Sequence, residues 1–255
     1  KNFKNIEKSF IHWLYKKMSS KKKILFFIGA RGNSKGLRKK NIKKIGNRTL
    51  LDITISQAKK SNFYNSIAVS SESSEILKLA KEKRVDLIIK RPKRLSKDQS
   101  SKFDVWKHAI KKYEEFYNSK LDILVELDCT NPLRKIKDVD NIIIQKIRNP
   151  KIDAVLTVCE SKKNPYFNMV EENKKKMLSI SKKINKWPTR RQDAPKVFEL
   201  IANTYCFEAQ FIKKKTNIFQ GKLRGYVLPK YQAIDIDEKF DFDLVEYIYK
   251  KYKFK

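Results

Sequence analysis

Short apolar runs alternate with segments of helical periodicity over the first 160 residues. The runs suited to buried strands are 24–29, 66–70, 85–89, 121–127 and 153–158. The segments with apolar residues at helical spacing are 49–60, 72–84, 102–117 and 137–148, with Ser71 or Ser73 and Asp138 placed to cap two of them. This alternation predicts an α/β fold around a mainly parallel sheet. Right-handed crossovers would then bring the carboxyl ends of the strands, and with them a ligand site, to one edge.

The periodicity stops between residues 160 and 200, where prolines, an Asn-rich turn and aromatic residues follow one another. We expect an arm or subdomain inserted in the fold, because a structureless loop of that length is improbable inside a compact domain. Order returns with the strand-like runs LIANTYCF and YVLP. The last segment, AIDIDEKFDFDLVEYIYKKY, predicts a short strand followed by a terminal helix.

The 255 residues suit one domain, which we place at 21–255, after a basic extension at 1–20 in which Met18 is a candidate natural start. No apolar run approaches the roughly 20 residues that span a bilayer, so we expect a soluble protein without a membrane partner. Cys129, Cys159 and Cys206 are far apart and odd in number. They predict buried free thiols and a cytoplasmic location.

The formal charge of +32 would attract nucleic acid, anionic lipid or phosphorylated small molecules. Only 11 of the 60 cationic residues are arginine, and the lysines are scattered along the whole chain. A nucleic-acid surface usually concentrates its charge and mixes in arginine and aromatic residues. Nucleic acid is therefore not expected as a partner, although a lysine-rich nucleic-acid-binding protein stays as the alternative from another class.

The stretch GARGNSKGLRKKN, residues 29–41, leaves the first predicted strand with three glycines and five cations. The glycines let the backbone come close to a ligand, and Arg31, Lys35 and Lys40 can reach phosphate oxygens. The loop suits a nucleoside triphosphate. It is not a Walker A motif, because Leu37 follows Gly36, and a solvated basic turn is the alternative.

A second chemical element is the acidic sequence DID at 235–237. In a strand, side chains two residues apart share a face, so Asp235 and Asp237 would present two carboxylates together. Such a pair suits Mg²⁺, with water and phosphate oxygens completing its shell. The alternative is a strand-end turn with exposed acids. Asp241 either favours the positive end of the last helix or supports the pair.

Six motifs in a fixed order together resemble the acylneuraminate cytidylyltransferases. They are ARGNSKGLRKKN, SSESSEI at 70–76, RP at 91–92, TNPLR at 130–134, RRQDAP at 190–195 and AIDID at 233–237. The resemblance implies a Rossmann-like nucleotidyltransferase domain whose arm, 160–200 here, joins two subunits. It also implies a homodimer whose sites are completed across the interface.

The reaction implied by the resemblance is transfer of CMP from CTP to the anomeric hydroxyl of a nine-carbon 2-keto acid sugar, releasing pyrophosphate, with Mg²⁺. The residues that would bind the nucleotide are Arg31, Gly32, Asn33, Ser34, Lys40, Asn41, Arg91 and Ser101. Those that would bind the acidic sugar are Asp128, Arg191, Gln192 and Tyr205. Asp235 and Asp237 would hold the metal. Arg31, Lys40 and Asp235 would be catalytic, with Asp235 or its bound water taking the hydroxyl proton.

The chain departs from the family pattern mainly around the sugar. Asp128 stands where the family often has a sugar-facing glutamine, and Ile201 with Ala202 replaces a frequent Asn-Gly pair. Arg38 replaces a frequent proline in the basic loop. A sugar of sialic, legionaminic or pseudaminic type therefore fits. A cytidylyltransferase for the eight-carbon acid Kdo is the alternative within the class.

Overall fold

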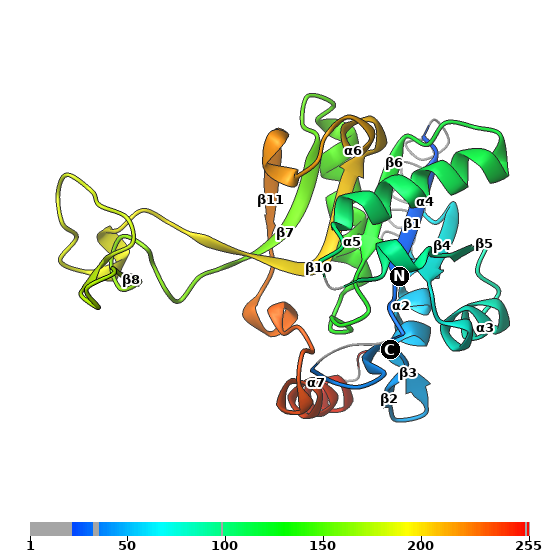
Figure 1. Ribbon diagram of the computed structural model, residues 1–255, viewed down its shortest axis with the longest axis horizontal. Coiled ribbons are helices and arrows are strands. Elements are labelled where there is room, and N and C mark those ends of the chain that lie inside the picture. Colours follow the sequence, from blue (N-terminus) through cyan, green and yellow to red (C-terminus); the bar gives the residue numbers. More distant parts are fainter. Residues whose placement is uncertain (1–21, 33–35, 98, 253, 255) are drawn as a thin grey trace, which may run out of the picture.

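The computed structural model describes residues 22–32, 36–97, 99–252 and 254, so the predicted extension at 1–20 lies outside the described residues. A seven-stranded sheet organises the molecule, in the order β11-β7-β10-β6-β1-β4-β5 (Figure 1). Its strands are β1 (Ile24–Gly29), β4 (Ser66–Ser71), β5 (Leu87–Lys90), β6 (Ile123–Leu127), β7 (Ala154–Glu160), β10 (Phe198–Glu208) and β11 (Leu223–Val227). All are parallel except β10, which runs antiparallel to both β6 and β7. The predicted mainly parallel mixed sheet is confirmed.

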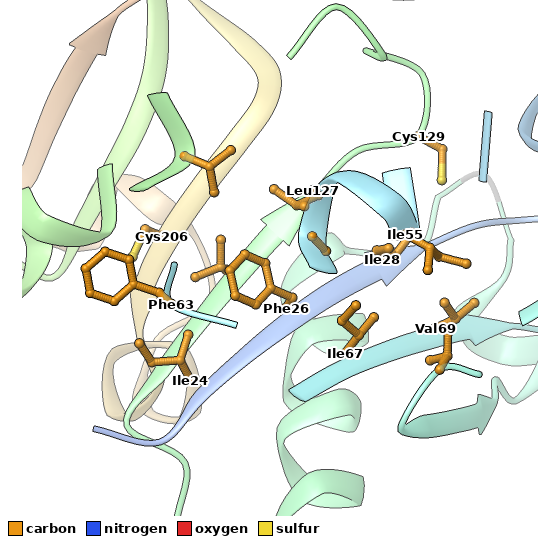
Figure 2. Packing of buried hydrophobic residues seen from close by; sticks show 14 of the residues in the cluster. Ile24, Phe26, Ile28, Ile55, Phe63, Ile67, Val69, Leu127, Cys129 and Cys206 are labelled. Atoms are coloured by element: carbon orange, nitrogen blue, oxygen red, sulfur yellow. The ribbon is translucent and has the colours of Figure 1, made fainter. Parts of the chain in front are cut away.

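Helices cover both faces of the sheet because its central strands are apolar on both sides. One face packs on α2 (Leu50–Lys59), α3 (Ser74–Glu82) and α5 (Ile136–Arg148), and the other on α4 (Lys102–Tyr117) and α6 (Ala209–Lys214). In β1, Ile24, Phe26 and Ile28 point to the first face, as Figure 2 shows, while Leu25 and Phe27 point to the second. This alternation follows from the period of two along a strand.

The helix caps agree with the sequence prediction in one case and differ in the other. Ser73 is the N-cap of α3, and its hydroxyl accepts the backbone N–H of Ile76. The prediction that Asp138 caps α5 is wrong, because the N-cap is Lys135 and Asp138 lies in the first helical turn. The Asp138 carboxylate instead accepts the phenol of Tyr226 and the amide of Gln232.

The terminal helix α7 (Lys239–Lys251) packs against the start of α2 through a small cluster that contains Leu37, Ile236 and Phe242. The strand predicted just before it is wrong, since residues 234–238 pair with no strand. Their backbone is instead held at separate points, and the Ile236 N–H donates to the Thr130 carbonyl at 3.0 Å. The small strands β2 (Lys44–Ile45) and β3 (Arg48–Thr49) form a hairpin beside α2.

The irregular segment 160–200 forms an arm that extends away from the sheet (Figure 1). Its tip carries a hairpin of β8 (Val170–Glu172) and β9 (Leu178–Ile180), and the chain returns through the long strand β10. The three cysteines are buried free thiols, as predicted. Among the described residues, no helix has the length and apolarity needed to cross a membrane.

Candidate active site

A cavity of about 710 Å³ lies at the edge of the sheet where the parallel strands end. It is bounded by the residues after β1, β5 and β6, by the start of α4 and by the segment 235–237. The predicted site residues that line it are Arg31, Lys40, Asn41, Arg91, Asp128, Asp235 and Asp237. The expectation of a ligand site at the carboxyl edge thus agrees with where the structure gathers these residues.

The basic loop after β1 is fastened to the acidic segment by two contacts. The Lys40 ammonium lies 2.9 Å from the Asp237 carboxylate. A Cβ at Gly36 would lie 2.2 Å from the Asp237 carbonyl oxygen, so only glycine allows this close approach of two backbones. The Asn41 amide donates to the Arg31 carbonyl at 2.9 Å and closes the loop on itself.

Two predicted nucleotide contacts, Asn33 and Ser34, lie outside the described residues. Gly32 is described, but it does not line the cavity; its N–H donates to the Glu72 carboxylate at 2.7 Å. A Cβ at Gly32 would lie 2.7 Å from the Cβ of Ser73, so this part of the loop rests against the start of α3.

The two aspartates of the DID sequence both line the cavity but differ in burial. Asp235 is half-buried, and its buried Oδ1 atom has no hydrogen-bond partner among the described residues, whereas the Asp237 side chain is 77% exposed. Burial raises the pKa of Asp235, and the neighbouring charge of Asp128 adds to this. The Asp241 carboxylate accepts the N–H groups of Asp237 and Glu238, at 3.0 and 2.9 Å, and so holds the segment's backbone.

This pair fits a magnesium ion by the chemistry of its donors. A carboxylate oxygen that is buried without a hydrogen-bond donor calls for a positive charge, and Mg²⁺ takes hard oxygen ligands. The described residues contain no group of three or more His, Cys, Asp or Glu side chains at metal-binding spacing. Such an ion would therefore take its remaining ligands from water and substrate oxygens.

Arg91 and the residues before α4 form a further part of the cavity lining. The buried Arg91 guanidinium donates to the Ser70 hydroxyl at 3.1 Å and to the Ser70 carbonyl at 2.8 Å. Burial lowers the pKa of Arg91. Ser101 is the N-cap of α4 and accepts the Phe103 N–H, so its neighbour Ser100, rather than Ser101, lines the cavity.

Asp128 lies in a polar cluster with Lys102 and Glu126, neither of which the sequence analysis singled out as a site residue. The Lys102 ammonium is 3.2 Å from the Asp128 carboxylate and 3.5 Å from that of Glu126. It also lies 6.0 Å from the centre of the Tyr205 ring, and burial raises the pKa of Tyr205 to about 12. Glu126 could have been found, because it is a charged residue among the apolar residues of the predicted strand run 121–127.

Arg134 of the TNPLR motif holds the backbone of Asp128 in this cluster through a hydrogen bond. Its guanidinium is buried and donates to the Asp128 carbonyl at 2.8 Å, to the Gln57 amide oxygen at 2.8 Å and to the Thr204 hydroxyl at 3.1 Å. Burial lowers its pKa to about 10. Arg134 therefore ties together α2, the end of β6 and strand β10 behind the cavity wall.

Arg191 and Gln192 do not meet the other predicted residues within one chain. They line a second cavity of about 390 Å³ at the base of the arm, together with Asn164, Lys196 and Lys230. The Arg191 guanidinium donates to the Ser161 carbonyl at 2.8 Å.

Comparison with known proteins agrees with this geometry. Residues 25–242 match the profile of the family described as Cytidylyltransferase. The chain is 34% identical to the post-translational flagellin modification protein B of Campylobacter coli, over 89% of this chain and 95% of that protein. It is 33% identical to the CMP-N,N'-diacetyllegionaminic acid synthase of Campylobacter jejuni, over 88% of this chain and 94% of that protein.

A more distant relative is also named as a cytidylyltransferase, and solved structures share the fold. The chain is 26% identical to the N-acylneuraminate cytidylyltransferase of Escherichia coli, and spans about half (52%) of its length. The structure of a CMP:2-keto-3-deoxy-manno-octonic acid synthetase with CTP superposes with a TM-score of 0.66 at 14% identity, covering 90% of this chain and 99% of that one. The structure of a 4-diphosphocytidyl-2C-methyl-D-erythritol synthase from Anaerococcus prevotii superposes with a TM-score of 0.62 at 14% identity. The match covers 91% of this chain and 98% of that one.

The sheet with its cavity at the carboxyl edge is a Rossmann-like nucleotidyltransferase fold, shared with these solved structures. The match over residues 25–242 then shows that the chain belongs to the cytidylyltransferase family, and it is a nucleotidyltransferase enzyme.

Replacing Gly36 with alanine tests whether the contact between the loop and the acidic segment sets the site's geometry. The new methyl group would lie 2.2 Å from the Asp237 carbonyl oxygen, so one of the two backbones has to move. Because a misplacement of about 1 Å can lower turnover by roughly 10²-fold, we expect kcat/KM to fall by about that factor. Gly225→Ala on β11 is the control, because there the nearest atom is a Val158 methyl group away from the cavity. Wild-type kinetics of Gly36→Ala would contradict the prediction.

Proposed function

We propose that this enzyme transfers CMP from CTP to the anomeric hydroxyl of a nine-carbon 2-keto acid sugar and releases pyrophosphate. The observation that carries the proposal is that one cavity joins the basic loop to the acidic pair, with Lys40 and Asp237 in contact at 2.9 Å. Cations beside carboxylates suit a triphosphate that carries a metal ion. The names of the relatives that are 33% and 26% identical to the chain support a nonulosonic acid as the acceptor.

The residues of the chain have separable tasks in this reaction. The sugar hydroxyl attacks the α-phosphorus in line; the new P–O bond forms as the bond to the β-phosphate oxygen breaks. Negative charge then accumulates on the departing pyrophosphate, and Arg31 and Lys40, which line the cavity, would stabilise it. Asp235, directly or through a water molecule, accepts the proton of the hydroxyl. No covalent enzyme intermediate is needed.

Asp235 and Asp237 are the residues that would hold Mg²⁺. When bound, the ion supplies positive charge to the phosphate oxygens. Asp241 holds the backbone of Asp237 and Glu238 through the two N–H groups that it accepts.

A legionaminic-type acid is our first candidate among the nine-carbon sugars. The relatives at 33–34% identity span nearly the whole chain, and one of them is named as a CMP-N,N'-diacetyllegionaminic acid synthase. The structural similarity to the synthetase for the eight-carbon acid is at 14% identity and supports the fold alone.

Pyrophosphate release tests the reaction and its substrates together. We expect release with CTP, but not with ATP, GTP or UTP, when legionaminic, pseudaminic, N-acetylneuraminic and Kdo acids are each offered with Mg²⁺. One of the nine-carbon acids should be preferred, and EDTA should abolish the release. Asp235→Asn should lower kcat by about 10²–10⁴-fold, since it removes the proton acceptor. Asp243→Asn on the exposed side of α7 is the control.

Three outcomes of this assay would contradict the proposal. A preference for Kdo would move the enzyme to the eight-carbon class. Normal turnover of Asp235→Asn at saturating Mg²⁺ would remove Asp235 from its role. If duplex DNA raised the melting temperature while CTP with Mg²⁺ did not, the nucleic-acid-binding alternative would be favoured, because a ligand stabilises the native state that binds it.

The arm is proposed to join two copies of the chain and to carry Arg191 and Gln192 to the cavity of the partner subunit. Large apolar side chains stand exposed along it, namely Met169, Val170, Met177, Leu178, Trp187, Phe198 and Leu200. Contiguous exposed apolar surface commonly marks an interface. The separation of Arg191 from the main cavity within one chain is explained if that cavity belongs to the other copy.

Mixing two inactive variants tests this arrangement. In a heterodimer of Arg191→Ala and Asp235→Asn chains, one site would combine a wild-type Asp235 with a wild-type Arg191 from the other copy. After random exchange of subunits, half of the dimers are mixed and each has one working site, so about a quarter of the wild-type activity should return. If activity does not return although light scattering shows dimers, Arg191 does not act across the interface.

A further inference from the structure

Strand β6 carries a carboxylate where its pattern calls for an apolar residue. Leu124, Glu126 and Asp128 alternate with Val125 and Leu127, so they face the α4 side of the sheet, where Leu124 packs in an apolar cluster with Trp106. Glu126 is buried, with 7% of its surface exposed, and lines the cavity. Acidic residues are almost never buried unless they are paired, and departures from the apolar pattern concentrate at functional sites.

The partner of this carboxylate is Lys102, the first residue of α4. Its ammonium lies 3.5 Å from Glu126 and 3.2 Å from Asp128, and the three side chains together line the cavity. The Lys102 side chain is 52% exposed, whereas those of Glu126 and Asp128 are 9% and 21% exposed. The lysine therefore lies over the two carboxylates at the surface of the cavity. Of its three N–H donors, one is directed to Asp128.

The salt bridge between Lys146 and Glu208 also joins a helix to the sheet, but it differs from the Lys102 cluster in its burial and its distance from the cavities. Lys146 of α5 pairs with Glu208 at 2.7 Å, but the Lys146 side chain is 2% exposed and lines neither cavity described above. The Lys102 cluster instead opens onto the space where the substrates meet.

The charge of the cluster restricts what it can bind. Within the cluster two carboxylates stand around one ammonium, so these carboxylates repel an anionic group. The triphosphate and the sugar carboxylate are instead attracted to the other cations that line the cavity, namely Arg31, Lys40, Arg91 and Lys97. Hydroxyl and acylamino groups are neutral and can both donate and accept hydrogen bonds. They can donate to the carboxylates of Glu126 and Asp128 and accept from the ammonium of Lys102.

We propose that Lys102, with Glu126 and Asp128, forms the subsite for a hydroxyl or acylamino substituent of the sugar, and that Lys102 determines which substituent is accepted. The inference rests on the proposed function, and it extends the predicted sugar contact of Asp128 to a lysine and a glutamate. The ring centre of Tyr205, which does not itself line the cavity, lies 6.0 Å from the ammonium.

Substitution of Lys102 by methionine removes the ammonium and keeps the length of the side chain. We expect the KM for the sugar to rise at least tenfold, because a hydrogen bond to a charged group is lost, while the KM for CTP stays within twofold. The preference for an acylamino sugar over its deaminated analogue should fall at least fivefold. Lys102→Arg retains the charge. Its KM for the sugar and its preference for the acylamino sugar should therefore lie between those of the wild type and those of Lys102→Met.

Lys146→Met is the matched control, since it also removes a lysine from an ion pair, but away from the cavity. It should lower the melting temperature and leave the KM for the sugar unchanged. If Lys102→Met does not fold, the double variant Lys102→Met with Glu126→Gln removes one charge of each sign and should show the same sugar-specific loss.

Two different failures can be told apart. If the wild type releases pyrophosphate and either Lys102→Met or the folded double variant keeps the wild-type KM and sugar preference, the subsite is contradicted while the proposed function stands. If the wild type turns over none of the nine-carbon acids, the proposed function is contradicted, and the subsite with it.

Discussion

The contact between the basic loop and the acidic segment is the constraint on which the site depends. Gly36 lies so close to the Asp237 carbonyl that a single methyl group would clash, and Lys40 holds the Asp237 carboxylate at 2.9 Å. The loop leaves β1 in the middle of the sheet, while the acidic segment comes from the last 21 residues of the chain. Contact between them closes the cavity between two parts of the chain some 200 positions apart. The buried Ile236 and Phe242 beneath give this contact an apolar support.

The cavity that results is lined by charges of both signs. Its cations are Arg31, Lys40, Arg91, Lys97 and Lys102, and its carboxylates are Glu126, Asp128, Asp235 and Asp237. Such a mixture orients charged ligands as well as attracting them, because each charged group of a substrate is drawn to groups of the opposite sign. Although the chain carries a charge of +32, the lining of its cavity thus contains four carboxylates as well as five cationic residues.

Much of this arrangement could be predicted from the sequence, for physical reasons that differ between elements. Strands such as Ile24–Gly29 and helix Lys102–Tyr117 have strong periodic patterns, and their observed bounds match the predicted ones. The conformation of residues 234–238 was predicted wrongly, because alternating Ile and Asp residues are typical of a strand. The backbone here is fixed instead by hydrogen bonds to the Thr130 carbonyl and to the Asp241 carboxylate. Lys102 was missed because a lysine at the start of a helix resembles any surface lysine in a chain with so many. Its role is visible only once the fold brings Glu126 and Asp128 beside it.

The central claim is that the basic loop and the acidic pair act on the same triphosphate. A crystal structure with CTP and Mn²⁺ in place of Mg²⁺ tests it most directly, through the anomalous signal of the metal. The account predicts a metal peak within ligand distance of Asp235 and Asp237, bridged to phosphate oxygens that Arg31 or Lys40 also contacts. A triphosphate bound away from the acidic pair, or a metal that shares no ligand with it, would contradict the account.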